Sequence, residues 1–216
     1  MDQLGVFLAD DHTVLRHGLR RIIEADPELR VVGEAGDGHA AVDQIHQLRP
    51  AVVLMDIGLP LLNGIDAARL VTKNDPSVKI VILSMHADQA YVRRSLEAGA
   101  RGYVLKDAES LDVVRAIKAV ARGGSFFSPA ISNLIRDGYL SPPRLEGRDD
   151  LDKLSDRERQ VLQLIAEGRV NKEIAVLLDV SLSTVESHRK RIMEKLDLHN
   201  TAGLVRFAIH YRLVDA

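Results

Sequence analysis

The chain has 216 residues, of which 46% are hydrophobic and 28% charged, and its formal net charge at pH 7 is -2. This length suits one domain of ordinary size together with a smaller one. The absence of cysteine excludes disulfides, thiolate nucleophiles and cysteine-based zinc sites. No stretch reaches the ~18 apolar residues of a membrane span, and Met1-Asp2-Gln3 does not begin a signal segment. We therefore expect a cytoplasmic protein with no membrane partner.

Strand-like apolar segments alternate with segments of helical period over residues 1–122. Strands are predicted at 6–9, 31–34, 52–55, 80–83 and 102–105, and a helix is predicted after each strand. Continuously apolar strands that alternate with helices favour a parallel sheet covered on both faces. The first domain is therefore predicted to be α/β, with a doubly wound five-stranded parallel sheet in the flavodoxin-like order 2-1-3-4-5.

Reactive side chains follow four of the five predicted strands. Asp10 and Asp11 follow the first strand, Asp56 the third, Ser84 the fourth and Lys106 the fifth. In the order 2-1-3-4-5 these four strands are neighbours, and their carboxyl ends form the edge at which such sheets bind ligands. Because crowded carboxylates repel one another, the site needs a cation, and hard oxygen ligands suit Mg²⁺. Each aspartate taken singly is more often a helix cap or a turn residue, but their joint placement favours a site.

This set of side chains is suited to phosphoryl transfer. Asp56 follows the central strand and is the expected nucleophile, while Mg²⁺ and Lys106 neutralise charge on the phosphoryl oxygens. Gly58, Pro60 and Gly64 make the loop after Asp56 compact. The sequence therefore predicts that Asp56 accepts a phosphoryl group.

Residues 4 to about 122 resemble the receiver domain of two-component response regulators. The resemblance is carried by Asp10-Asp11, Asp56-Ile57-Gly58-Leu59-Pro60, Asn63-Gly64, Leu83-Ser84 and Gly102-Tyr103-Val104-Leu105-Lys106. It implies that a sensor histidine kinase phosphorylates Asp56, and that Asp10, Asp11, Asp56 and the Gly58 carbonyl surround Mg²⁺. It also implies that Ser84 and Tyr103 form a coupled switch.

Residues 123–153 are expected to form a short helix and a linker. The helix begins in the segment Phe126-Phe127-Ser128-Pro129 and should pack on the preceding domain. The segment from Ser141 to Asp150 has no apolar period, so we expect an exposed tether.

Residues 154–216 are predicted to form a small all-α domain of four helices. Ser155 and Glu158 form a capping box at the start of the first helix, and the other helices are expected at about 172–178, 182–196 and 201–212. Two short helices joined by a tight turn before a longer one are typical of a helix-turn-helix domain. Val185 and Ile192 fall on the inner face of the long helix.

The outer face of the long helix offers groups that can bind DNA. Lysine and arginine can bind guanine or phosphate, serine can bind either, and glutamate can accept from cytosine. The candidate DNA-binding residues are Lys172, Thr184, Glu186, Ser187, Lys190 and Arg191. Arg189 is expected to turn toward the core. Mixed charges on a helix face are often only solvated, and residues 151–216 carry 11 basic against 10 acidic residues, so charge alone does not indicate DNA binding.

The segment from Leu154-Ser155 through Leu213 resembles the DNA-binding domain of LuxR-type regulators. The resemblance is strongest in Asn171-Lys172-Glu173-Ile174-Ala175, Thr184-Val185-Glu186-Ser187-His188 and Lys195-Leu196. Together, the two halves resemble the NarL/FixJ class of response regulators. This implies a transcription factor that binds double-stranded promoter DNA, as a homodimer when phosphorylated, with a dimer contact from Leu204, Val205 and Ala208. Phosphorylation would either relieve inhibition by the receiver or drive dimerisation.

Two other classes of function remain open. Phosphatases and phosphotransferases of the haloacid dehalogenase type use a similar set of residues, but they need a second aspartate two residues after the nucleophile, where this chain has Gly58. We therefore expect a protein that is not a turnover enzyme. The other alternative is a receiver whose carboxyl-terminal helices serve protein assembly in place of DNA binding.

Overall fold

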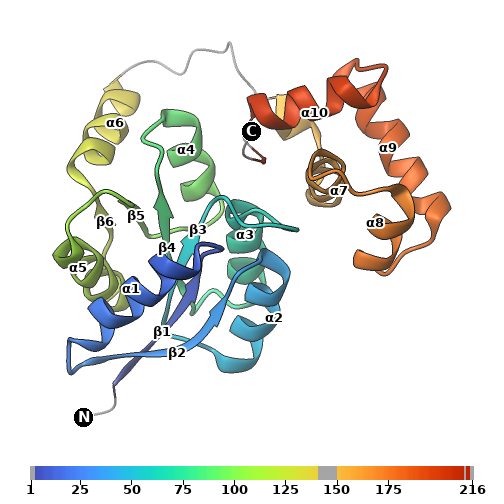
Figure 1. The fold of residues 1–216 in the computed structure, drawn as a ribbon. Helices are drawn as coiled ribbons and strands as arrows, with labels where there is room; N and C mark the ends of the chain where they lie inside the picture. The colour runs from blue at the N-terminus through green and yellow to red at the C-terminus, as the bar shows by residue number, and fades with distance from the viewer. Residues whose placement is uncertain (1–2, 141–149, 212, 215–216) are drawn as a thin grey trace. The chain divides into compact units, whose positions relative to one another are not determined.

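The computed structural model describes residues 3–140, 150–211 and 213–214, which form two compact units (Figure 1). The units are Met1–Pro143 and Arg144–Ala216. The predicted tether, 141–150, lies outside the described residues except for Asp150. Among the described residues, no helix has the length and apolar character that crossing a membrane requires.

The first unit alternates strands and helices along the chain. Its elements are β1 Leu4–Ala9, α1 Thr13–Glu24, β2 Leu29–Ala35, α2 Gly38–Leu48, β3 Val52–Asp56, α3 Gly64–Asn74, β4 Lys79–Ser84, α4 Gln89–Glu97, β5 Gly102–Leu105, α5 Ser110–Ala121, β6 Phe126–Phe127 and α6 Pro129–Leu140. All paired strands are parallel, in the order β2-β1-β3-β4-β5-β6. The predicted fold class and the order 2-1-3-4-5 are confirmed.

The predicted number of five strands is wrong, because β6 adds a sixth strand at the edge of the sheet beside β5. Phe126 pairs with Gly102 and Phe127 with Tyr103. The strand is only two residues long and leads directly into α6. A two-residue strand is too short to show the alternating pattern of a strand. Phe126 and Phe127 were therefore assigned to the beginning of the helix that follows.

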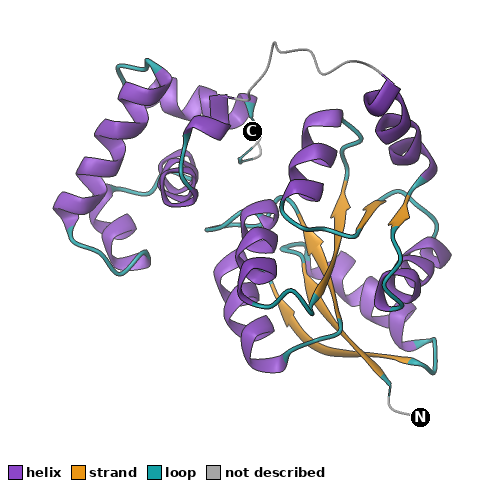
Figure 2. Cartoon of the chain, turned by 180° about the vertical axis from the view of Figure 1, so that it is seen from behind, coloured by secondary structure: helices purple, strands orange, loops and turns teal. Residues whose placement is uncertain are grey.

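The sheet separates two hydrophobic cores, and Figure 2 shows helices on both of its faces. Phe7 and Ala9 face the core that α2, α3 and α4 cover, while Val6 and Leu8 face the core under α1 and α5. This alternation follows from the two-residue period of a strand, and it is why the central strands are apolar on both faces. Ile131 of α6 is fully buried in the first of these cores, so α6 packs within the first unit.

Among the described residues of the second unit, all regular elements are helices. It contains the short 3-10 helix η1 Asp150–Lys153 and the helices α7 Asp156–Ala166, α8 Asn171–Leu177, α9 Leu182–Leu196 and α10 Thr201–His210. Both hydrogen bonds of the capping box predicted at Ser155 and Glu158 are present. Val185 and Ile192 are fully buried, which fixes the face that α9 turns toward the core.

Helix α10 packs on α7, and two of the residues that were expected to contact a second copy of the chain are buried within the second unit. Leu204 and Ala208 are fully buried, and only Val205 is partly exposed. The expected dimer contact is therefore wrong for Leu204 and Ala208. An apolar helix face looks the same in a sequence whether it covers its own core or a partner.

Candidate functional site

Three of the predicted site residues meet in a buried ion-pair cluster at the carboxyl edge of the sheet. The Nζ atom of Lys106 lies 2.8 Å from Asp10 Oδ2 and 2.8 Å from Asp56 Oδ2. The three side chains are between 1% and 7% exposed. One ammonium therefore holds two buried carboxylates, which come from adjacent strands.

Asp11 lies at the rim of this cluster beside a residue that the sequence analysis did not single out. The Asp11 side chain is 34% exposed, and its Oδ1 atom lies 2.7 Å from Nδ1 of His12. One ligand atom from each of Asp10, Asp11, His12 and Asp56 can be chosen so that all four lie within 4.8 Å of one another. Nothing in the pattern of the sequence distinguished His12 from a solvated residue at the start of a helix.

The donor set fits a hard divalent cation. Asp10, Asp11 and Asp56 offer carboxylate oxygens, which Mg²⁺ prefers. Gly58 is exposed at the same edge and makes a backbone hydrogen bond to Asp56. The structure thus brings together the side chains that the resemblance assigned to a metal, with Gly58 next to them.

The loop after β3 is held tightly against Asp56. The Gly64 N–H donates to the Ile57 carbonyl at 2.9 Å, and a Cβ atom on Gly64 would fall 1.8 Å from the Asp56 carbonyl oxygen. Asn63 caps α3 by accepting the N–H groups of Ile65 and Asp66. The glycine is needed because the backbone of α3 approaches β3 so closely.

Burial dominates the electrostatics of the Asp56 carboxyl. Burial raises the pKa of Asp56 above its ordinary value, the charge of Lys106 opposes the rise, and the charge of Asp10 adds to it. For Lys106, burial favours a lower pKa, but the charge of Asp56 and the hydrogen bonds to Asp10 and Asp56 outweigh it and raise the pKa. The ammonium is therefore retained within the cluster.

The two predicted switch residues both bind the backbone of His86. The Ser84 Oγ atom accepts the His86 N–H at 3.0 Å, and the Tyr103 hydroxyl donates to the His86 carbonyl at 2.8 Å. Tyr103 is 1% exposed, and burial raises its pKa to about 12. The Tyr103 ring is turned inward. Because both side chains bond the backbone of His86, a change at Ser84 and a change at Tyr103 would act on the same short segment.

Arg16 of α1 binds the backbone of Asp10, and the sequence did not predict this contact. Its Nη1 atom donates to the Asp10 carbonyl at 2.5 Å, and its Nε atom lies 3.0 Å from Glu34 Oε2 on β2. Arg20 binds the other carboxylate oxygen of Glu34, Oε1. Such contacts between α1 and β2 depend on packing, which no local pattern of the sequence reveals.

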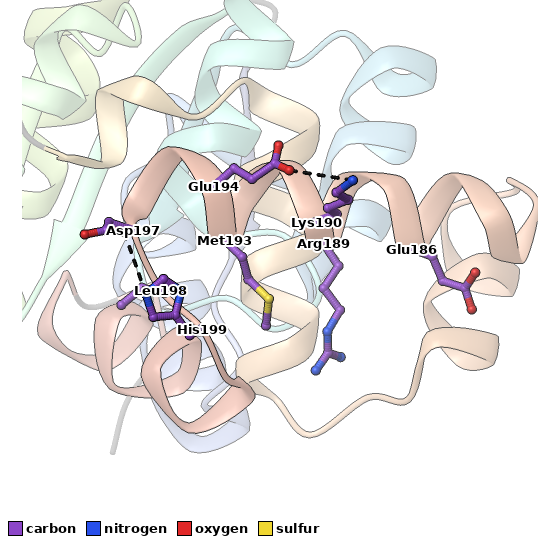
Figure 3. Close-up of a pocket in the computed structure, with 8 residues that line it drawn as sticks. All are labelled: Glu186, Arg189, Lys190, Met193, Glu194, Asp197, Leu198 and His199. Atoms are coloured by element: carbon purple, nitrogen blue, oxygen red, sulfur yellow. Dashed lines mark ion pairs between the residues drawn. The ribbon is translucent and has the colours of Figure 1, made fainter.

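The residues predicted to bind DNA occupy the outer face of α9 and its surroundings. Glu186, Ser187, Lys190 and Arg191 are exposed on α9, Lys172 is exposed on α8, and Thr184 is partly buried. The Lys190 Nζ atom lies 3.8 Å from Glu194 Oε1. Figure 3 shows this pair on one side of α9, with Arg189 and Met193 projecting from another side. Helix α9 therefore exposes several charged and polar side chains.

Arg189 lines an open pocket together with Glu186 and Lys190, and it also contacts the neighbouring helices. It donates hydrogen bonds to Asn171, the first residue of α8, at 3.3 Å, and to Thr201, the first residue of α10. It therefore joins α9 to the two neighbouring helices, in agreement with the expectation that it turns inward. Ser187 is exposed, but its hydroxyl already donates to the Ser183 carbonyl at 2.8 Å.

A doubly wound parallel sheet with an aspartate–lysine cluster, followed by a helix-turn-helix unit, defines the class of response regulators. The response regulator receiver domain model matches residues 6–118. The model described as bacterial regulatory proteins, luxR family, matches residues 152–208. The chain belongs to the response regulators that join a receiver domain to a LuxR-type DNA-binding domain, and it is a transcription regulator of the NarL, DegU and UvrY type.

Similar proteins match over nearly the full length of the chain. The transcriptional regulatory protein MctR of Rhizobium johnstonii is 39% identical over 99% of this chain and 96% of its own. The response regulator UvrY of Escherichia coli is 34% identical over 99% of this chain and 97% of its own. Among solved structures, an RcsB–DNA complex is 30% identical with a TM-score of 0.58, over 95% of this chain and 98% of that chain.

Proposed function

We propose that Asp56 is the phosphoacceptor of this protein and that a sensor histidine kinase is the donor. The observation that carries the proposal is the Lys106 ammonium 2.8 Å from both Asp10 and Asp56. A carboxylate oxygen of Asp56 attacks the phosphorus of a phosphohistidine, and the P–O bond forms as the P–N bond breaks. The electron pair of the P–N bond stays on the imidazole, which leaves as the neutral ring because its other nitrogen already carries a proton. Lys106 is placed to neutralise the incoming phosphoryl oxygens.

The acidic residues are proposed to hold Mg²⁺ during this transfer. Asp10, Asp11, Asp56 and the carbonyl of Gly58 would be its ligands from the protein. When bound, the cation neutralises charge on the phosphoryl group. Asp10 also keeps Lys106 in place through the ion pair described above.

The protein is proposed to stop at the phosphorylated state. Gly58 occupies the position at which a phosphatase of the haloacid dehalogenase type has its general acid, so no carboxyl group is available there to protonate a leaving group. Ser84 and Tyr103 would then transmit the phosphoryl group's presence through the backbone of His86. Phosphorylation is thus a signal and not a step in turnover.

The second unit is proposed to bind double-stranded promoter DNA. In this proposal, Glu186, Ser187, Lys190 and Arg191 of α9 enter the major groove, and Lys172 and Thr184 bind phosphates. We propose a homodimer as the phosphorylated, DNA-binding form. Because Leu204 and Ala208 are fully buried within one chain, other residues would have to form the contact between the two copies.

The phosphoacceptor assignment is tested by labelling the full chain with acetyl phosphate and Mg²⁺. We expect a single phosphoryl group on the wild type and none on Asp56→Asn. Asp66→Asn is a useful control, because Asp66 is a buried aspartate that accepts a hydrogen bond from the Asn63 side chain and lies outside the cluster. Labelling that survives Asp56→Asn would place the phosphoacceptor elsewhere.

The DNA proposal is tested by selecting bound sequences from a random duplex pool. We expect the wild type to enrich one sequence motif, and we expect Lys190→Ala and Arg191→Ala to weaken or abolish the enrichment. If the wild type enriched no motif with or without acetyl phosphate, the alternative of a protein-assembly role for these helices would be favoured.

A further inference from the structure

Strand β5 carries Tyr103 and leads to Lys106, but its neighbour on the outer side of the sheet is very short. β6 pairs with β5 only at Gly102 and Tyr103. The next residues of the outer segment turn into α6. The Leu105 N–H, immediately before Lys106, therefore has no strand partner on that side, and a partly buried N–H needs a hydrogen-bond acceptor.

Ser128 supplies the missing partner. Its Oγ atom accepts the Leu105 N–H at 3.2 Å, and its own N–H donates to the Tyr103 carbonyl at 3.0 Å. The residue is 3% exposed. On the other side of β5, the Lys106 N–H donates to the Ser84 carbonyl of β4 at 2.9 Å. The backbone that carries Lys106 is thus held from both sides.

The same serine begins α6. The Ser132 N–H donates to the Ser128 carbonyl at 2.9 Å, within the first turn of the helix. Ile131 is fully buried in the core below, so this turn is anchored to the first unit. One residue therefore contacts the strand that carries Tyr103 and leads to Lys106. The same residue also contacts α6, the helix that precedes the chain segment leading to the second unit.

We propose that Ser128 is a positioning residue that sets the place of Lys106 over Asp56 and joins the phosphoryl site to α6. The inference rests on the proposed phosphorylation of Asp56. A movement of β5 when the phosphoryl group arrives would pull on the two hydrogen bonds of Ser128, and the serine would pass the movement to the first turn of α6. Ser128 itself contacts neither the phosphoryl group nor the donor.

The first test compares phosphorylation kinetics of full-length variants with acetyl phosphate and Mg²⁺. We expect Ser128→Ala to raise the donor concentration for half-maximal rate about fivefold, the effect of losing a hydrogen bond of ordinary strength. Ser132→Ala is the matched control, because it removes an exposed hydroxyl of the same helix whose hydrogen bond goes to the Phe127 carbonyl of β6 and not to β5. Ile131→Ala is the packing control, because it loosens α6 without removing a hydrogen bond from β5. We expect both controls to stay near the wild-type value, and Ser128→Thr, which keeps the hydroxyl, to restore it.

The second test measures hydrogen exchange of the α6 amides before and after phosphorylation. We expect the exchange rates to change on phosphorylation in the wild type and in Ser132→Ala, and the change to be lost in Ser128→Ala. If Ser128→Ala and the wild type needed the same donor concentration for half-maximal rate, the positioning role would be overturned. It would also be overturned if Ile131→Ala raised that concentration as much as Ser128→Ala. An unchanged α6 response in Ser128→Ala would overturn the link. If the wild type itself were not labelled at Asp56, the proposed function would fail instead.

Discussion

The two units place their charged functional residues in opposite environments. In the first unit, Lys106 is 7% exposed and is paired with two buried carboxylates. In the second, the Lys190 side chain is 79% exposed, and the nearest acidic atom of Glu194 is 3.8 Å away. The first arrangement is a preorganised, buried ion-pair cluster that suits a small charged group. The second is an open surface whose contacts are weak and easily screened until a large partner covers them.

The comparison predicts that one substitution in the cluster has a larger effect than any one on the surface. Lys106→Ala removes the cation from two buried carboxylates and from the position of the phosphoryl oxygens. We expect the rate of Asp56 phosphorylation to fall by about a hundredfold, the usual effect of losing a preorganised charge at such a site. The rate is measured with acetyl phosphate and Mg²⁺. A loss of less than about threefold, too small for a preorganised charge, would show that the buried cluster is structural only.

A substitution one step away from the cluster should have the next largest effect. Arg16→Ala removes the donor to the Asp10 carbonyl, and we expect the affinity for Mg²⁺ to fall about tenfold, as when a residue supporting a metal ligand is lost. The affinity is measured by titration calorimetry. Arg20→Ala is the matched control, because Arg20 binds the same Glu34 carboxylate through its other oxygen, whereas the Asp10 carbonyl is bound by Arg16. Equal losses in the two variants would assign the effect to the Glu34 ion pairs.

On the open surface we expect smaller effects that depend on salt. Lys190→Ala and Arg191→Ala should each weaken DNA binding about fivefold or more, and a residue that binds phosphate should also reduce the salt slope by about one. Affinities are measured over a series of salt concentrations. Neither variant should change acetyl phosphate labelling. Salt-independent losses would mean that these side chains are not on the DNA.

The smallest effect is expected from the one buried acid in α7. Although burial opposes it, the hydrogen bonds from Lys195 and Ser155 lower the pKa of Glu158 below its ordinary value. A lowered pKa means stability that is present above the unfolded-state pKa and is lost as the pH falls through the folded-state pKa. We expect Glu158→Gln to lower the melting temperature near pH 7 and to lose this effect in acid. Glu194→Gln, at an exposed position, should show neither change at any pH.

The sequence predicted those parts of the site that depend on strand ends. Asp10, Asp56 and Lys106 follow apolar strands, so their meeting at one edge required only the correct strand order. Arg16 and Ser128 could not be found in this way, because each acts through backbone groups of a segment that only packing brings near. Leu204 and Ala208 were misplaced for a related reason: their spacing marks an apolar face, but it does not say which surface covers that face.

The central claim is that phosphorylation of Asp56 controls DNA binding by α9. The most direct measurement is the affinity of the full chain for its selected duplex, with and without acetyl phosphate and Mg²⁺, in the wild type and in Asp56→Asn. We expect acetyl phosphate to change the affinity of the wild type for the duplex and to leave the affinity of Asp56→Asn unchanged. An equal change in both proteins, or no change in a wild type shown to be phosphorylated, would contradict it.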